Sequence, residues 1–120
     1  MKPDLSLAGA ALSMAALMTL SAGVMAQPDG AALYDMYCVQ CHGTRGDGKG
    51  VNAGHLNVQP RSHIDKTEML QRSDDELTKV IAEGGKSINK SILMPAWEHN
   101  LDEAEIKALV THLRQLCCTN

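Results

Sequence analysis

The sequence predicts an all-α domain in which three or four helices are joined by two long loops. Two observations favour this class. Apolar residues recur at helical spacing in several segments, and no segment alternates apolar and polar residues as a half-buried strand would. The chain has 120 residues but no Phe, one Trp and two Tyr. With so few large side chains, a small domain often needs a staple or a prosthetic group to complete its core.

Caps and apolar spacing locate the helices. Asp29 is the expected cap of the first helix, Ser73 opens a capping box, and Gly84-Gly85 ends the helix that follows Ser73. The last helix opens with Asp102 and an acidic residue three positions on. The segments expected to be helical are residues 30–38, 67–71, 73–84 and 101–116.

Glycine and proline mark the loops between these helices. Residues 43–54 contain five glycines, and Gln59-Pro60-Arg61-Ser62 extends this loop. A second loop covers residues 86–99. Loops this long are unusual in a small domain unless they enclose something.

The first 26 residues are expected to be a secretory signal peptide. A cationic start at Lys2 precedes an apolar stretch, and the small residues Val24 and Ala26 stand before Gln27. The alternative is a retained N-terminal anchor helix. Cleavage would leave one domain, residues 27–120, in the periplasm.

The charge balance excludes one large class of function. The net charge is −3, both signs are interspersed, and there is neither a basic run nor a set of aromatic residues to stack on bases. No nucleic-acid partner is expected.

The motif with the clearest chemistry is Cys38-Val39-Gln40-Cys41-His42. A structural disulfide, a thioredoxin-type redox pair and half of a zinc site are its competitors. The second needs a strand–helix context that is missing here, and the third needs another Cys or His pair. Two thiols about one helical turn apart can each add to a haem vinyl group, while the adjacent imidazole reaches the iron. The motif therefore predicts one covalently attached haem c.

The chain resembles the class I c-type cytochromes, over essentially all of residues 27–120, in an ordered set: Gly30, Tyr34, Cys38, Cys41, His42, Gly43, Met94 and Pro95, then a C-terminal amphipathic helix. This resemblance implies the small cytochrome c fold, with its helices and loops wrapped around one haem. It also implies that the first helix crosses closely over the last through Gly30 and Tyr34. His112 stands where the family's last helix normally has an aromatic residue.

Met94 is the expected sixth ligand of the iron, opposite His42. It lies in a loop beside Pro95 and matches the family position. Met36 is too near the attachment site to reach the opposite haem face, and Met69 is expected to fill a gap in the core. The remaining candidates are His63, His99, Met69 and an open site. A His–Met pair leaves no place for a substrate, which favours electron transfer over catalysis.

Three further residues are expected near the haem. The resemblance implies that a loop proline, here Pro60, gives its backbone carbonyl to the axial imidazole. Arg61 could pair with a haem propionate, or simply be a solvated loop residue. Trp97 could pack on the haem edge or donate to a propionate; a plain core aromatic is the competing interpretation.

The adjacent residues Cys117 and Cys118 lie outside the haem argument. They could form a strained ring disulfide, bridge two chains or remain as thiols. A frayed tail of variable oxidation on a monomer is the favoured interpretation, with a disulfide-linked dimer through Cys117 or Cys118 as the alternative.

The sequence as a whole predicts a single-electron carrier of a periplasmic respiratory chain, not catalytic on its own, that docks transiently with redox partners. It is also similar to small cytochromes of denitrifying bacteria, some of which accompany the cytochrome cd-type nitrite reductase. The alternatives are a ligand-binding or peroxidase-like haem protein with an open sixth site, and a dedicated subunit or maturation partner of a periplasmic reductase.

Overall fold

The computed structural model describes residues 26–119, and this part of the chain is helical without any strand. Five α-helices follow one another, with 3-10 turns at Ala53–His55 and Gly85–Ile88; the helices are α1 (Gly30–Tyr37), α2 (Val39–His42), α3 (Lys66–Leu70), α4 (Asp74–Glu83) and α5 (Glu103–Cys118). The predicted all-α class is confirmed. The expected signal segment lies outside the described residues but for Ala26. No helix in residues 26–119 is both long and apolar enough to cross a bilayer.

The helix starts agree with the caps expected from the sequence. The side chain of Asp29 accepts from the backbone of α1, and Asp65 caps α3 in the same way. Ser73 and Asp102 each form a complete capping box with the glutamate three residues on. Each box satisfies backbone donors that a helix start would otherwise leave unpaired.

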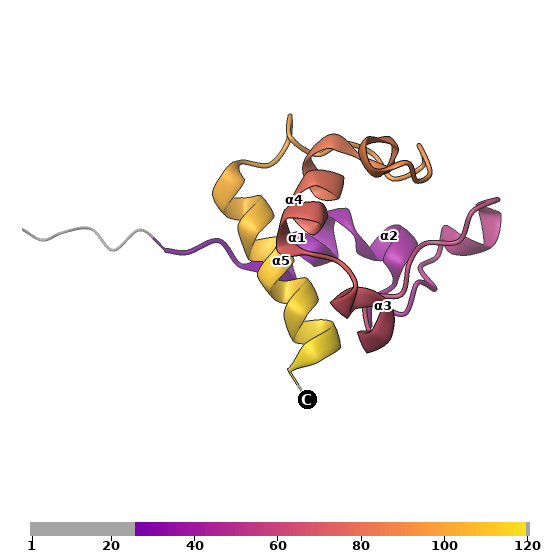
Figure 1. Cartoon of the computed structure of the whole chain (residues 1–120), viewed down its shortest axis with the longest axis horizontal. Coiled ribbons are helices and arrows are strands. Elements are labelled where there is room, and N and C mark those ends of the chain that lie inside the picture. Colours follow the sequence, from indigo (N-terminus) through magenta and orange to yellow (C-terminus); the bar gives the residue numbers. More distant parts are fainter. Residues whose placement is uncertain (1–25, 120) are drawn as a thin grey trace, which may run out of the picture.

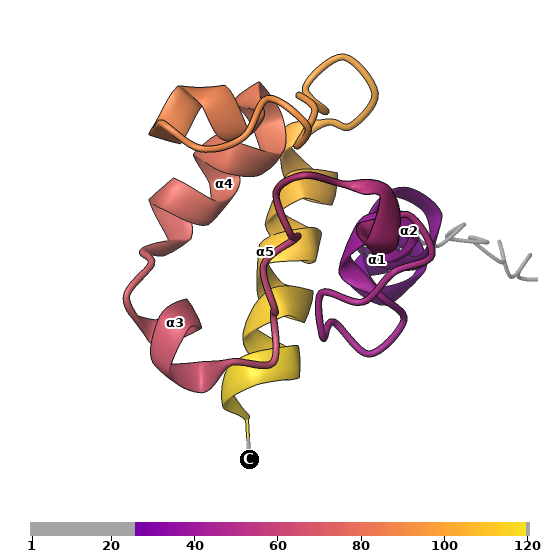
Figure 2. The same cartoon turned by 90° about the vertical axis from the view of Figure 1, so that its right-hand side faces the viewer.

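Helix α5 is the centre of the arrangement. Figure 2 shows α3 and α4 on one side of it and α1 and α2 on the other, and Figure 1 shows α1 crossing it. The crossing is close at Gly30, where an added Cβ would lie against the Ala108 carbonyl and 3.1 Å from the Cβ of His112. The ring of His112 in turn lies 5.2 Å from the ring of Tyr34. His112 is therefore an interhelical residue, and glycine is required at position 30 because nothing larger fits.

The core is apolar and gathers around α5. No polar or charged residue of the described part is buried. Met69 is only 1% exposed, which confirms that it fills the core. The cluster of buried residues is Tyr34, Met69, Leu77, Ile81, Leu101, Ile106, Leu109, Val110, Leu113 and Cys117.

The end of α5 differs from the expected frayed tail. The helix continues through Cys118, and Cys117 is buried in the core cluster. A disulfide joins Cys117 to Cys118. The prediction of a frayed tail is therefore wrong, because burial of Cys117 holds the last turn against the domain. The disulfide-linked dimer, the alternative interpretation, would need this bond to open first.

Arg114 connects α5 to the junction of α3 and α4. Its guanidinium donates to the carbonyl oxygens of Met69 and Arg72, at 2.7 and 2.5 Å, and to Asp74 Oδ1 at 2.8 Å. The Met69 carbonyl, at the end of α3, also accepts from the backbone N–H of Arg72 at 3.2 Å, whereas in the described residues only Arg114 donates to the Arg72 carbonyl. One side chain thus satisfies three acceptors at this junction.

We expect Arg114→Met to lower the free energy of unfolding by about 2 kcal/mol, since it leaves the partly buried Arg72 carbonyl without a donor and removes the partner of Asp74, while keeping most of the apolar stem. Denaturant unfolding of the haem-bearing protein measures this. Arg45→Met is the matched control, because Arg45 is 83% exposed and its one partner in residues 26–119 is Asp47. Equal stability of the two variants would contradict the role given to Arg114.

Candidate haem-attachment site

The attachment motif lies at the corner between α1 and α2. The backbone N–H of Cys38 still bonds to the Tyr34 carbonyl, 2.8 Å away, and the carbonyl of Cys38 accepts from Cys41 and His42 at 3.2 and 2.9 Å. Cys38 and Cys41 are thus one turn apart, and both thiols are free. Burial, and to a lesser extent Cys41, raises the pKa of the Cys38 thiol to about 12, so this thiol stays protonated before any bond is made.

The glycine-rich loop after the motif folds back onto α2. The backbone N–H groups of Gly48, Gly50 and Asn52 donate to the carbonyls of His42, Cys41 and Gln40 at 2.8, 3.0 and 2.8 Å. These are the carbonyls that a four-residue helix leaves without partners. The loop was expected to enclose something, and part of what it encloses is the end of the motif itself.

The imidazole of His42 is oriented by a backbone carbonyl. Its Nδ1 lies 2.9 Å from the carbonyl oxygen of Arg61. Burial lowers the pKa of His42, which keeps the ring neutral. A neutral ring that donates from Nδ1 has its lone pair on Nε2, the state a metal ligand needs.

The prediction that Pro60 supplies this carbonyl is wrong by one residue. The carbonyl of Arg61 accepts from His42 instead. The carbonyl oxygen of Pro60 faces Gly48, and a Cβ added at Gly48 would lie 2.6 Å from this oxygen. Successive carbonyls of an extended segment point in opposite directions, so only one of the two neighbours can face His42.

His63 and Tyr34 lie beside the same imidazole. The rings of His42 and His63 are stacked, with centroids 4.1 Å apart and planes 18° from parallel. The Tyr34 hydroxyl lies 3.0 Å from Nδ1 of His63. His63 had been a candidate for the ligand opposite His42, which is wrong because it lies against His42 itself. Sequence reasoning missed this contact, since a loop histidine far from the motif carries no local signal of it.

Met94 lies in a loop held against the end of α4. Its carbonyl accepts from the backbone N–H of Gly85 at 2.9 Å. The backbone N–H of Trp97 donates to the carbonyls of Ile81 and Ala82, each at 3.0 Å. A Cβ added at Gly84 would lie 2.9 Å from the Met94 carbonyl oxygen, and one added at Gly85 would lie 3.1 Å from the Met94 Cβ. The Gly-Gly pair was predicted only to end the helix. Because it has no side chains, this pair also lets the Met94 segment come close to the end of α4.

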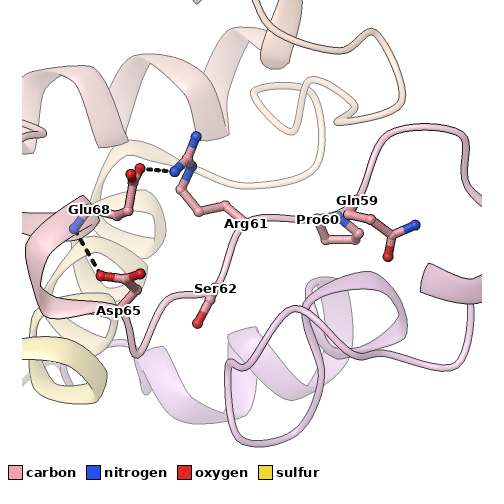
Figure 3. A pocket seen from close by; sticks show the side chains of 6 residues that line it. All are labelled: Gln59, Pro60, Arg61, Ser62, Asp65 and Glu68. Atoms are coloured by element: carbon pink, nitrogen blue, oxygen red, sulfur yellow. Dashed lines mark hydrogen bonds and ion pairs between the residues drawn. The ribbon is translucent and has the colours of Figure 1, made fainter.

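The remaining predicted site residues have contacts of their own. Trp97 is half-buried against the core, with its ring 5.0 Å from that of Tyr37. Arg61 lies at a surface pocket of about 290 Å³, where its guanidinium pairs with Glu68 (Figure 3). His99 is 85% exposed and is not placed as a buried ligand.

The residues present fit a covalently held haem better than a bare ion. Two free thiols one turn apart stand beside an imidazole whose Nδ1 is already bonded. No group of three or more His, Cys, Asp or Glu side chains in the described residues could hold a metal ion alone. Apolar side chains on the two long loops remain exposed, as expected of loops that cover an apolar group: Val51, Val58, Ile92 and Leu93.

Fold and side chains together define a small helical protein that carries covalent haem c. A family model described as "Cytochrome C oxidase, cbb3-type, subunit III" matches residues 26–113, and the chain belongs to this family. The cofactor is haem c, and the activity is haem-based electron transfer, as in a class I-like c-type cytochrome.

Solved structures agree with this assignment. The KustC0563 c-type cytochrome is 28% identical, with a TM-score of 0.61 over 74% of this chain and 98% of that chain. A chain of the Kuenenia stuttgartiensis reducing HAO-like protein complex Kustc0457/Kustc0458 is 23% identical, with a TM-score of 0.59 over 73% of this chain and 41% of that chain, and shares the fold. No curated protein matches the chain significantly.

Proposed function

We propose that this protein is a single-electron carrier of a periplasmic respiratory chain. Its haem is bonded through Cys38 and Cys41, with His42 and Met94 as the axial ligands. Residues 1–26 direct export, and residues 27–120 form the carrier. When bound, the haem supplies one-electron chemistry, with iron cycling between Fe(II) and Fe(III).

The observation that carries this proposal is that both ligand residues are held by their backbone surroundings. His42 is bonded to the Arg61 carbonyl, and the Met94 segment is bonded to Gly85 and lies against Gly84. A ligand held in this way keeps its place when the charge of the iron changes, and a six-coordinate iron has no position for a substrate. Both properties favour electron transfer over catalysis.

The partners we infer are redox proteins that dock transiently. Weak, fast encounters suit a carrier that must leave after each electron. The solved neighbour named as part of a protein complex supports contact between domains of this fold and other redox proteins. The finer proposal is a place in denitrification, beside a cytochrome cd-type nitrite reductase, and it rests on the sequence resemblance alone.

Met94→Ala tests the proposed ligand. We expect the variant to keep its covalent haem, lose the weak sulfur-to-iron charge-transfer band of the oxidised protein, and bind carbon monoxide promptly at neutral pH. Visible spectra of both oxidation states measure this. The matched control is Met36→Ala, because Met36 is 68% exposed on α1. A sulfur band that survives in Met94→Ala would mean that another residue is the ligand.

A wild-type protein that is high-spin and binds carbon monoxide as readily as Met94→Ala would favour the open-site alternative. The same spectra therefore decide between the carrier and a ligand-binding or peroxidase-like protein.

A further inference from the structure

The contacts of His42 point to support for the axial ligand beyond its single hydrogen bond. The Cβ–Cγ bond and the bond at Nδ1 hold two neighbouring atoms on one edge of the imidazole. A contact on the face of the ring restrains the tilt of the ring that these two leave. The nearly parallel ring of His63, 4.1 Å away, provides this contact.

His63 is itself held at two further places. Its backbone N–H donates to the Gly46 carbonyl at 2.6 Å, which fixes its main chain. Its Nδ1 is bonded to the Tyr34 hydroxyl at 3.0 Å, which fixes its ring. A neutral imidazole makes this bond in either tautomer, because a hydroxyl both donates and accepts.

Tyr34, which bonds His63, is itself held in place by the core. It is 1% exposed, belongs to the core cluster, and lies on α1 where that helix crosses α5. The helix crossing thus reaches His42 through two contacts, Tyr34 to His63 and His63 to His42. Phe in place of Tyr34 would fill the same space in the crossing, so packing alone does not account for the hydroxyl.

We propose that Tyr34 and His63 are positioning residues that fix the plane of the axial His42 imidazole and so tune the reduction potential of the bound haem. The inference rests on the ligation by His42 proposed above. The plane of an axial imidazole sets how unpaired spin is distributed over the haem in the oxidised state. It also sets how well Nδ1 is aligned with the Arg61 carbonyl, a bond that makes the ligand more basic and stabilises Fe(III).

The test uses the haem-bearing protein and two variants, Tyr34→Phe and His63→Leu. We expect both to alter the spread of the paramagnetically shifted haem-methyl signals in proton NMR and to raise the reduction potential, with the larger change in His63→Leu. Because Tyr34 acts through His63, adding Tyr34→Phe to His63→Leu should produce no further change. The matched control is Tyr37→Phe, which removes a hydroxyl from the same helix beside Trp97 and should leave both readouts unchanged.

The proposal is overturned if Tyr34→Phe gives the haem-methyl pattern and potential of Tyr37→Phe, or if the two changes add in the double variant. Should His63→Leu fail to fold, Tyr34→Phe alone decides, since it preserves the ring in the core. The proposed carrier function fails on a different observation, which is the absence of the sulfur-to-iron band in the wild-type protein. The haem-methyl pattern still reports the His42 plane in that case.

Discussion

Replacing both Cys38 and Cys41 by serine is expected to abolish the cooperative thermal unfolding of the domain. Without the two thiols no thioether forms, and haem cannot be retained covalently. Far-ultraviolet circular dichroism should show much of the helical signal lost at 25 °C, and heating should give a broad, shallow change in place of a transition. This would be the largest effect of any substitution considered.

The reason lies in where the apolar side chains are. The buried cluster gathers around α5, whereas the long loops expose large apolar residues: Ile92 and Val51 are each 76% exposed. In a small domain whose loops bury so little apolar surface, the free energy gained by burial barely offsets the conformational entropy lost on folding. The covalent haem is expected to give both loops a surface to pack on.

The control for this experiment keeps the haem and changes the other two cysteines. Cys117→Ser with Cys118→Ser should retain a cooperative transition at a somewhat lower Tm, since Cys117 is buried at the end of α5. If the Cys38 and Cys41 variant unfolded cooperatively near the Tm of the haem-bearing protein, the haem would not be completing the core.

Gly30→Ala is expected to destabilise the haem-bearing protein by about 2–3 kcal/mol. The added methyl would lie against the Ala108 carbonyl and 2.7 Å from its carbon, so α1 must move away from α5. Backbone atoms cannot rotate aside as a side chain can. The gain in helix propensity from alanine, about 1 kcal/mol, is too small to compensate.

Denaturant unfolding measures this effect, and Gly54→Ala is the matched control. An added Cβ at Gly54 meets nothing within 4 Å, so the control should be neutral or slightly stabilising. Similar stability of the two variants would show that the α1–α5 crossing is looser than the structure indicates.

Features that depend on local sequence could be predicted, and those that depend on packing between distant segments could not. The capping boxes at Ser73 and Asp102 located α4 and α5, since a cap acts within one turn. The 3-10 turns and α2 were missed, because four residues are too few to display a helical period.

The candidate site divides in the same way. The Cys-x-x-Cys-His spacing predicts haem attachment from five adjacent residues. The carbonyl that accepts from His42 was misplaced by one residue because it depends on how an extended loop turns as it passes α2. The stack of His63 on His42 joins segments 21 positions apart, and nothing in either segment alone indicates it.

The fold-back of the glycine-rich loop has a consequence for biogenesis. All of its bonds to α2 join residues between Val39 and Asn52, so this hairpin-like unit closes over a short length of chain. Contacts so near in sequence form early in folding. The crossing of α1 over α5, by contrast, joins the first and last helices of the described residues and must wait until α5 has been made. We therefore expect the two thiols to lie in a defined turn, accessible for haem attachment, while the rest of the chain is still open.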